Sequence, residues 1–124
     1  MFRTLAHRWP LFAAAIDRVE TLVTRRDPRW PAVRRAHLRV QPACAACGND
    51  DPDAVEVHHI APVSVCPSRE LDPTNLLTLC TCGPGGLNCH LVVGHCGRWT
   101  VANPTPSYDA NWMLGLLAAG RRAA

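Results

Sequence analysis

The chain has 124 residues, which is enough for one small domain, and a hydrophobic content of 48% excludes a chain that is disordered by composition. No apolar run approaches the roughly 20 residues that a bilayer span needs, and the odd total of seven cysteines argues against a secreted fold held only by disulfides. The net charge of +3 is unevenly spread, because nine arginines and three acids give residues 1–39 a charge of +6, whereas residues 40–99 carry −4.

The first 28 residues are predicted to contain a helix with one apolar face. Pro10 suits its first turn, and the pair Asp27-Pro28 ends it. The apolar residues recur at helical spacing, at Phe12, Ile16, Val19 and Val23. Packing against a core is the simplest explanation of such a face.

A second, short helix is predicted to begin at Trp30-Pro31, again with proline in the first turn. Its inner face would carry Val33, His37 and Val40. The basic side chains that point elsewhere are Arg34, Arg35 and Arg39. The concentration of arginine in this part of the chain favours a polyanionic partner, although a solvated helix face explains the charge equally well.

From Pro42 onward, short strands and loops are expected. Residues 54–58 alternate valines with polar residues and predict a strand, and the apolar run at residues 76–80 predicts a second one. Between them, residues 60–72 contain two prolines and are expected to form a long loop. Residues 81–88 are expected to form a glycine-rich loop.

Two further helices are predicted near the C-terminal end. Residues 89–93 can open a helix with Asn88 as its N-cap, and Gly94 and Gly97 keep it short. Residues 108–120 predict a final amphipathic helix. The apolar face of that helix would carry Trp112, Leu114, Leu116 and Leu117.

Four cysteines give the strongest chemical signal. Cys44 and Cys47 form a CxxC knuckle, and Cys80 and Cys89 supply a second pair, in which Cys82 could replace Cys80. Two thiolates from one turn and two from elsewhere favour a closed tetrahedral zinc site, which is structural because no position is left for a substrate. A reducing, cytoplasmic setting is expected, in which cysteines are more often metal ligands than disulfide partners. The cysteines expected to be free thiols are Cys66, Cys82 and Cys96.

A second group of polar residues consists of four histidines and an asparagine. His58 and His59 end the first predicted strand, where adjacent side chains point to opposite faces, so the two imidazoles need not share a function. His90 and His95 lie on or just after the short helix, and Asn75 stands at the start of the second strand. Structural histidines explain any two of these residues, but they explain the whole group less well.

Several stretches of the chain resemble the HNH endonucleases, and two upstream stretches resemble the zinc-containing branch of that family, which is common in phages and bacteria. These stretches are residues 57–62 (VHHIAP), 71–80 (LDPTNLLTLC) and 88–95 (NCHLVVGH), with residues 29–35 (RWPAVRR) and 44–48 (CAACG) upstream. The resemblance covers about residues 29–100. It implies an α+β fold, a small ββα-metal core with a structural zinc site of four cysteines, flanked by N-terminal and C-terminal helices.

The resemblance also divides the chain into three parts. Residues 1–40 would form an arginine-rich helical arm, residues 41–99 the HNH nuclease core, and residues 100–124 a C-terminal tail and helix that pack on the core. The arginines implied to contact nucleic acid are Arg25, Arg26, Arg29, Arg34, Arg35 and Arg39, because guanidinium groups bind phosphates in a bidentate manner.

The roles of individual residues follow from the same resemblance. It places His59, Asn75 and His90 in the catalytic set, with His59 as the general base and Asn75 accepting a hydrogen bond from the other ring nitrogen of His59. His58 and His90 would hold one catalytic divalent metal, and His95 would add a metal or phosphate contact. Many HNH proteins have aspartate in place of His58, and an all-histidine set favours Zn²⁺, Ni²⁺, Co²⁺ or Mn²⁺, although Mg²⁺ remains open if phosphate and water complete its shell.

The implied activity is metal-dependent hydrolysis of phosphodiester bonds in double-stranded DNA, by nicking or by double-strand cleavage. Two alternatives remain open: a zinc-containing module that binds nucleic acid without cutting it, and a toxin-type nuclease that acts on cellular DNA or RNA. No association with membranes is expected. The expected location is the cytoplasm of a bacterial cell or of a phage-infected host.

Overall fold

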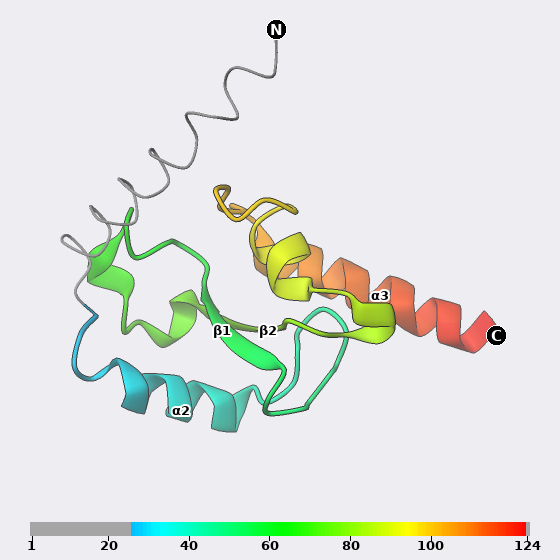
Figure 1. Cartoon of the computed structure of the whole chain (residues 1–124), viewed down its shortest axis with the longest axis horizontal. Coiled ribbons are helices and arrows are strands. Elements are labelled where there is room, and N and C mark those ends of the chain that lie inside the picture. Colours follow the sequence, from blue (N-terminus) through cyan, green and yellow to red (C-terminus); the bar gives the residue numbers. More distant parts are fainter. Residues whose placement is uncertain (1–25, 124) are drawn as a thin grey trace, which may run out of the picture.

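The computed structural model describes residues 26–123, and its fold is of the α+β class (Figure 1). The longer elements are helix α2 (Trp30–Val40), strands β1 (Val55–His59) and β2 (Leu76–Cys80), and helix α3 (Pro106–Ala123). Short helical turns lie between them, at η1 (Pro67–Arg69), η2 (Pro73–Asn75), η3 (Pro84–Gly86) and η4 (His90–Gly94). The helix expected near the start of the sequence, and Arg25 with it, lie outside the described residues.

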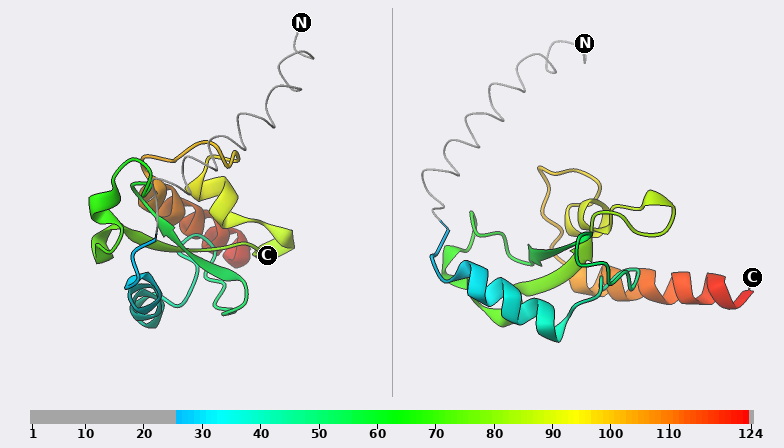
Figure 2. Two further views of the ribbon diagram at one scale, coloured as in Figure 1. Left: turned by 60° about the vertical axis from the view of Figure 1, so that its left-hand side comes forward. Right: turned by 60° about the horizontal axis from the view of Figure 1, so that its bottom comes forward.

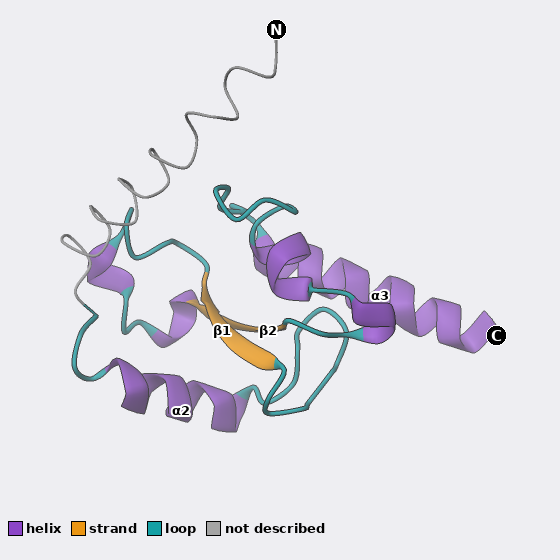
Figure 3. Cartoon of the chain, in the orientation of Figure 1, coloured by secondary structure: helices purple, strands orange, loops and turns teal. Residues whose placement is uncertain are grey.

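Strands β1 and β2 form an antiparallel hairpin, which confirms both strand predictions to within one residue (Figure 3). The register pairs Val55 with Cys80 and His59 with Leu76. All five residues of β2 are buried, which explains why this strand has an apolar sequence rather than an alternating one. Thr78 is the polar exception, and its main-chain N–H and hydroxyl donate to the side chain and the main chain of Gln41, respectively. These bonds fix the end of α2 against the sheet.

Helix α2 and turn η4 lie on different sides of the hairpin (Figure 2). Because side chains alternate along a strand, neighbouring residues of β1 face these two elements in turn. His58 faces η4, where its ring lies near those of His90 and His95, whereas the ring of His59 lies against Trp30 at the start of α2. The two adjacent histidines therefore contribute to different surroundings, as expected from strand geometry.

The three helices expected after residue 28 lie where the sequence predicts them, but some of their apolar residues are exposed rather than buried. Val40 is 86% exposed, because α2 packs on the core through Leu38 and the chain turns at Gln41 just after it. In α3, Trp112 and Leu116, two of the four apolar residues expected to mark its apolar face, are 63% and 52% exposed. The face that packs on the core carries Ala110, Met113 and Leu117, at steps of three and four residues. None of the helices in residues 26–123 combines the length and apolar character that a membrane span requires.

Candidate metal centre and active site

Four cysteines converge at one end of the hairpin. The Sγ atoms of Cys44, Cys47, Cys80 and Cys89 all lie within 4.8 Å of one another, and all four residues are buried. Cys82 is exposed and outside this group, so the structure places Cys80 in the cluster rather than its alternative. Gly83 allows the following loop to approach, because a Cβ there would lie 3.1 Å from the Cys47 sulfur and 3.2 Å from that of Cys80.

The protonation of these thiols shows that the cluster suits a cation. Burial acts against ionisation of Cys44, but hydrogen bonds from main-chain N–H groups, including those of Ala46 and Cys47, lower its pKa. Burial raises the pKa of Cys47 to about 11. Burial, followed by the negative charge of Cys44, also raises the pKa of Cys89. The protein alone therefore favours the thiolate of Cys44 but not those of Cys47 and Cys89. Four thiolates at this spacing need a cation, and the donor set fits zinc.

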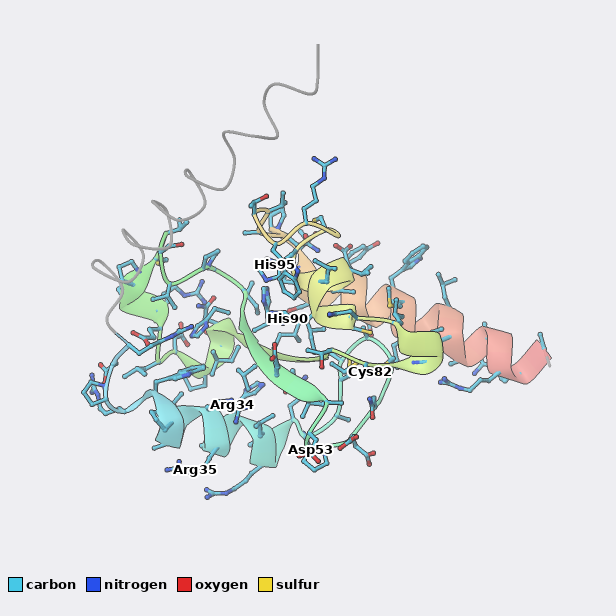
Figure 4. The ribbon with its side chains drawn as sticks, viewed as in Figure 1. Arg34, Arg35, Asp53, Cys82, His90 and His95 are labelled. Carbon is cyan, nitrogen blue, oxygen red and sulfur yellow. The ribbon has the colours of Figure 1, made fainter. Side chains whose placement is uncertain are left out.

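The second cluster joins β1 to η4. The ring centroids of His58, His90 and His95 are 5.1–5.2 Å apart, and one nitrogen from each ring lies within 4.8 Å of the others (Figure 4). His90 and His95 are separated by five residues, one more than an α-helical pair. Turn η4 is a π-helix, whose wider turn brings residues five apart onto one side. Asn88 caps this turn as predicted, by accepting from the N–H of Leu91.

Hydrogen bonds to two of these rings leave one nitrogen of each ring for a metal. The Nδ1 atom of His90 lies 2.7 Å from a carboxylate oxygen of Glu56, and that of His95 lies 2.8 Å from the carbonyl of Val101. Both acceptors require N–H at Nδ1, so Nε2 carries the lone pair. The Nε2 atom of His58 is buried without a hydrogen-bond partner. A cation bound between the three rings would provide the partner that this buried nitrogen of His58 lacks.

The surroundings of His58 and His90 favour the neutral imidazole that metal binding needs. Burial lowers the pKa of His58 to about 4, with further lowering by the charges of His90 and His95. Burial also lowers the pKa of His90, although Glu56 opposes this effect. Since ligating imidazole must be neutral, these two residues are ready to bind a cation at neutral pH without first losing a proton.

His59 lies apart from this cluster, between the Trp30 ring and the main chain of Glu70. Its Nε2 atom lies 2.9 Å from the carbonyl oxygen of Glu70, and its ring centroid lies 4.5 Å from that of Trp30. The residue is buried, and burial lowers its pKa, although the bond to Glu70 opposes the shift. Since Nε2–H donates to a carbonyl, Nδ1 is the basic nitrogen of this ring.

Asn75 does not make the expected contact with His59. Its Oδ1 atom accepts from the N–H of Ala61 at 2.7 Å, and its Nδ2 donates to the carbonyls of Ala61 and Arg69. The acceptor for His59 is the neighbouring main-chain carbonyl of Glu70 instead. Asn75 thus holds both ends of the loop that carries this acceptor, and it is completely buried.

The start of α2 is attached to the same loop. Glu70 is buried, and its carboxylate accepts from the N–H of Asp27 and lies 3.7 Å from the Arg26 guanidinium. That guanidinium also lies 5.4 Å from the centre of the Trp30 ring. These contacts place Trp30 beside His59. Sequence reasoning missed Glu70 and Trp30 in this role, because a main-chain acceptor and a ring contact leave no sequence motif.

The arginines expected to contact nucleic acid differ in their surroundings. Arg26 and Arg29 form ion pairs with Glu70 and Asp27, respectively. The arginines of α2 have no ion pair within residues 26–123, and Figure 4 shows two of them along this helix. These residues are Arg34, Arg35 and Arg39. Their guanidinium groups are the ones left for an external anion.

Gly94 is another residue whose role sequence reasoning missed, and substituting it should weaken the histidine cluster. A Cβ at this position would lie 3.1 Å from two ring atoms of His58 and 3.2 Å from His90. We expect Gly94→Ala to lower metal affinity at the histidines by about 10- to 100-fold, since displaced ligands cost that much. Titration calorimetry with Ni²⁺ on zinc-loaded protein measures this affinity.

Gly115→Ala provides the matched control for this measurement. A Cβ at Gly115, on α3, meets no atom within 4 Å, so the Ni²⁺ affinity of this variant should equal that of the wild type. Equal affinities for wild type and Gly94→Ala would show that the ring positions do not depend on this close approach.

Comparison with known proteins identifies the central part of the chain. The family model described as HNH endonuclease matches residues 44–95. This segment includes the four clustered cysteines, the three clustered histidines, His59 and Asn75. No curated protein and no solved structure matches the chain significantly.

Proposed function

We propose, from the match of residues 44–95 to the HNH endonuclease family model, that the protein is a metal-dependent endonuclease that hydrolyses phosphodiester bonds in double-stranded DNA. The observation that carries the proposal is the buried Nε2 atom of His58, which has no hydrogen-bond partner and is grouped with His90 and His95. The next residue in the sequence, His59, is a buried imidazole whose Nε2 is hydrogen-bonded and whose Nδ1 can accept a proton. A cation-binding group and a general base on one strand are the two components that phosphodiester hydrolysis requires.

His59 serves as the general base in this proposal. Its Nδ1 atom takes a proton from the attacking water, and its Nε2–H bond to the Glu70 carbonyl stabilises the imidazolium that results. Burial keeps the pKa of His59 below its ordinary value, so the ring is neutral and able to accept a proton at pH 7. Asn75 and Trp30 are positioning residues, which act through the loop and through the ring of His59.

His58, His90 and His95 would hold the catalytic divalent metal, and Cys44, Cys47, Cys80 and Cys89 a structural zinc. When bound, the catalytic cation neutralises charge that develops on the scissile phosphate. Glu56 and the Val101 carbonyl orient two of the three ligands and increase their basicity. Three imidazoles favour Zn²⁺, Ni²⁺, Co²⁺ or Mn²⁺ over Mg²⁺.

The α2 arginines supply the electrostatic part of DNA binding. Arg34, Arg35 and Arg39 lie on the helix that also carries Trp30, so phosphates bound there lie along the element that positions the base. Binding through such contacts weakens as salt rises, because counterions compete for the phosphates. The cluster of four cysteines needs reduced thiols, which supports a cytoplasmic location.

Cleavage of supercoiled plasmid tests the proposal directly. Protein loaded with zinc at the cysteines is assayed with added Mg²⁺, Mn²⁺, Ni²⁺, Co²⁺ or Zn²⁺, and with excess EDTA. We expect conversion to nicked or linear DNA with at least one cation and none with EDTA. Binding of plasmid without product at every cation would contradict nuclease activity and favour a binding module, and a preference for RNA would favour a toxin-type nuclease.

A further inference from the structure

Trp99 is a large aromatic residue that remains open to solvent directly beside the histidine cluster. Its ring centroid lies 5.0 Å from that of His95 and 5.3 Å from that of His90, in tilted and edge-on arrangements. The residue is nevertheless 56% exposed. More than half of the indole surface is therefore open to solvent at the edge of the histidine cluster.

The loop that carries Trp99 is held in place by hydrogen bonds. The carbonyl of Val101 accepts from His95, and the N–H groups of Arg98 and Val101 donate to the carbonyls of His95 and Arg98. Asn103 donates from its side chain to the carbonyl of Val93, and from its main chain to that of Gly94. The main chain on both sides of Trp99 is thus held in place before any ligand arrives, which reduces the entropy lost on binding.

The chemistry of the indole selects one part of a nucleic acid. A phosphate oxygen gains little from an aromatic ring, whereas every nucleobase has a flat face that stacks on one. In a regular duplex, neighbouring bases cover these faces, so an indole can reach one only where a base is unpaired or displaced. Since the histidines bind the metal that contacts the phosphate, a nucleotide near that phosphate places its base within reach of Trp99.

We propose that Trp99 stacks on an unpaired or displaced nucleobase next to the phosphate that is cleaved. The inference rests on the proposed nuclease function and deepens it, because it makes distorted DNA the preferred substrate. Arg98 precedes Trp99 and is exposed, which adds a positive charge beside the stacked nucleotide.

Fluorescence anisotropy tests this inference without cleavage, by using His59→Ala protein and labelled duplexes. One duplex is fully paired, and the other carries a single unpaired nucleotide. We expect Trp99→Ala, in this background, to weaken binding of the bulged duplex by about 5- to 100-fold and to change binding of the paired duplex little. Trp99→Phe should retain most of the affinity, because it keeps an aromatic face.

Two controls separate stacking from a merely structural role of the indole. Trp112→Ala removes a similarly exposed tryptophan from α3 and should leave both affinities unchanged. Ni²⁺ affinity, measured by calorimetry, should be the same with and without Trp99. Equal losses on both duplexes, or a matching loss of metal affinity, would overturn the inference. Discrimination that depends on Trp99, together with wild-type protein that cleaves no plasmid with any cation, would overturn the nuclease proposal and leave the stacking intact.

Discussion

Replacing His59 with alanine is expected to slow plasmid cleavage by about 10²- to 10⁴-fold, the usual contribution of a general base. The affinities for metal and DNA should not change, because the ring lies on the α2 side of β1, away from the histidine cluster. Rates with saturating cation, measured from the conversion of supercoiled DNA, give the comparison.

His59→Gln separates base catalysis from the structural hydrogen bond. Glutamine can donate an N–H to the Glu70 carbonyl, as Nε2 does, but it cannot accept a proton at neutral pH. We expect this variant to be as slow as His59→Ala, and added imidazole to restore part of the rate in the alanine variant. Wild-type rates in the glutamine variant would show that His59 only positions the loop.

The wild-type pH profile has a defined direction. Burial lowers the pKa of His59 and favours the neutral form, which is the active one. The rate should therefore be insensitive to this residue above the ordinary histidine range and fall as the pH drops below it. Burial lowers the pKa of His58 to about 4, so this metal ligand stays neutral in the ordinary histidine range.

The sequence predicted the elements that local patterns define. The apolar run of β2 and the alternation of β1 located both strands, and the CxxC knuckle led to the cysteine cluster. Strand geometry also indicated that His58 and His59 need not share a function, and their rings do have different neighbours. These features depend on residues close together in the chain, where spacing carries the information.

The predictions that failed concern burial and hydrogen-bond partners, which depend on residues far apart in the sequence. Helical periodicity indicates an apolar face but not whether a small core covers it, and Trp112 and Leu116 on that predicted face are in fact exposed. Every residue has a main-chain carbonyl, so the sequence cannot indicate which one accepts a hydrogen bond. The acceptor for His59 is therefore the carbonyl of Glu70 and not the side chain of Asn75 that was predicted. Gly94 and Glu56 act on the histidines only through the packing of η4 on β1.

The two candidate metal sites share one short segment of chain. Cys89 belongs to the cysteine cluster, and the next residue, His90, belongs to the histidine cluster. The cysteine cluster also includes Cys80 at the end of β2, opposite Val55 on the strand that carries His58. A cation at the cysteines therefore fixes η4 against the hairpin, and with it the spacing of the three histidines.

Replacing Cys89 with serine should consequently unfold the domain as well as remove its zinc. Apparent binding energies of structural zinc, about 10–16 kcal/mol, equal or exceed the total stability of a small domain, about 5–15 kcal/mol. We expect this variant to lose its cooperative thermal transition and its near-ultraviolet circular dichroism. Elemental analysis of the purified protein should show that the zinc held by the cysteines is lost.

Two controls show whether the loss comes from the cysteine site. Cys82→Ser alters an exposed thiol outside the cluster and should keep both the zinc and the thermal transition. His58→Ala should keep the structural zinc and the fold but lose affinity for the second cation, since the cysteines do not depend on it. A Cys89→Ser protein that melts like the wild type would mean that the apolar core alone holds η4 against the hairpin.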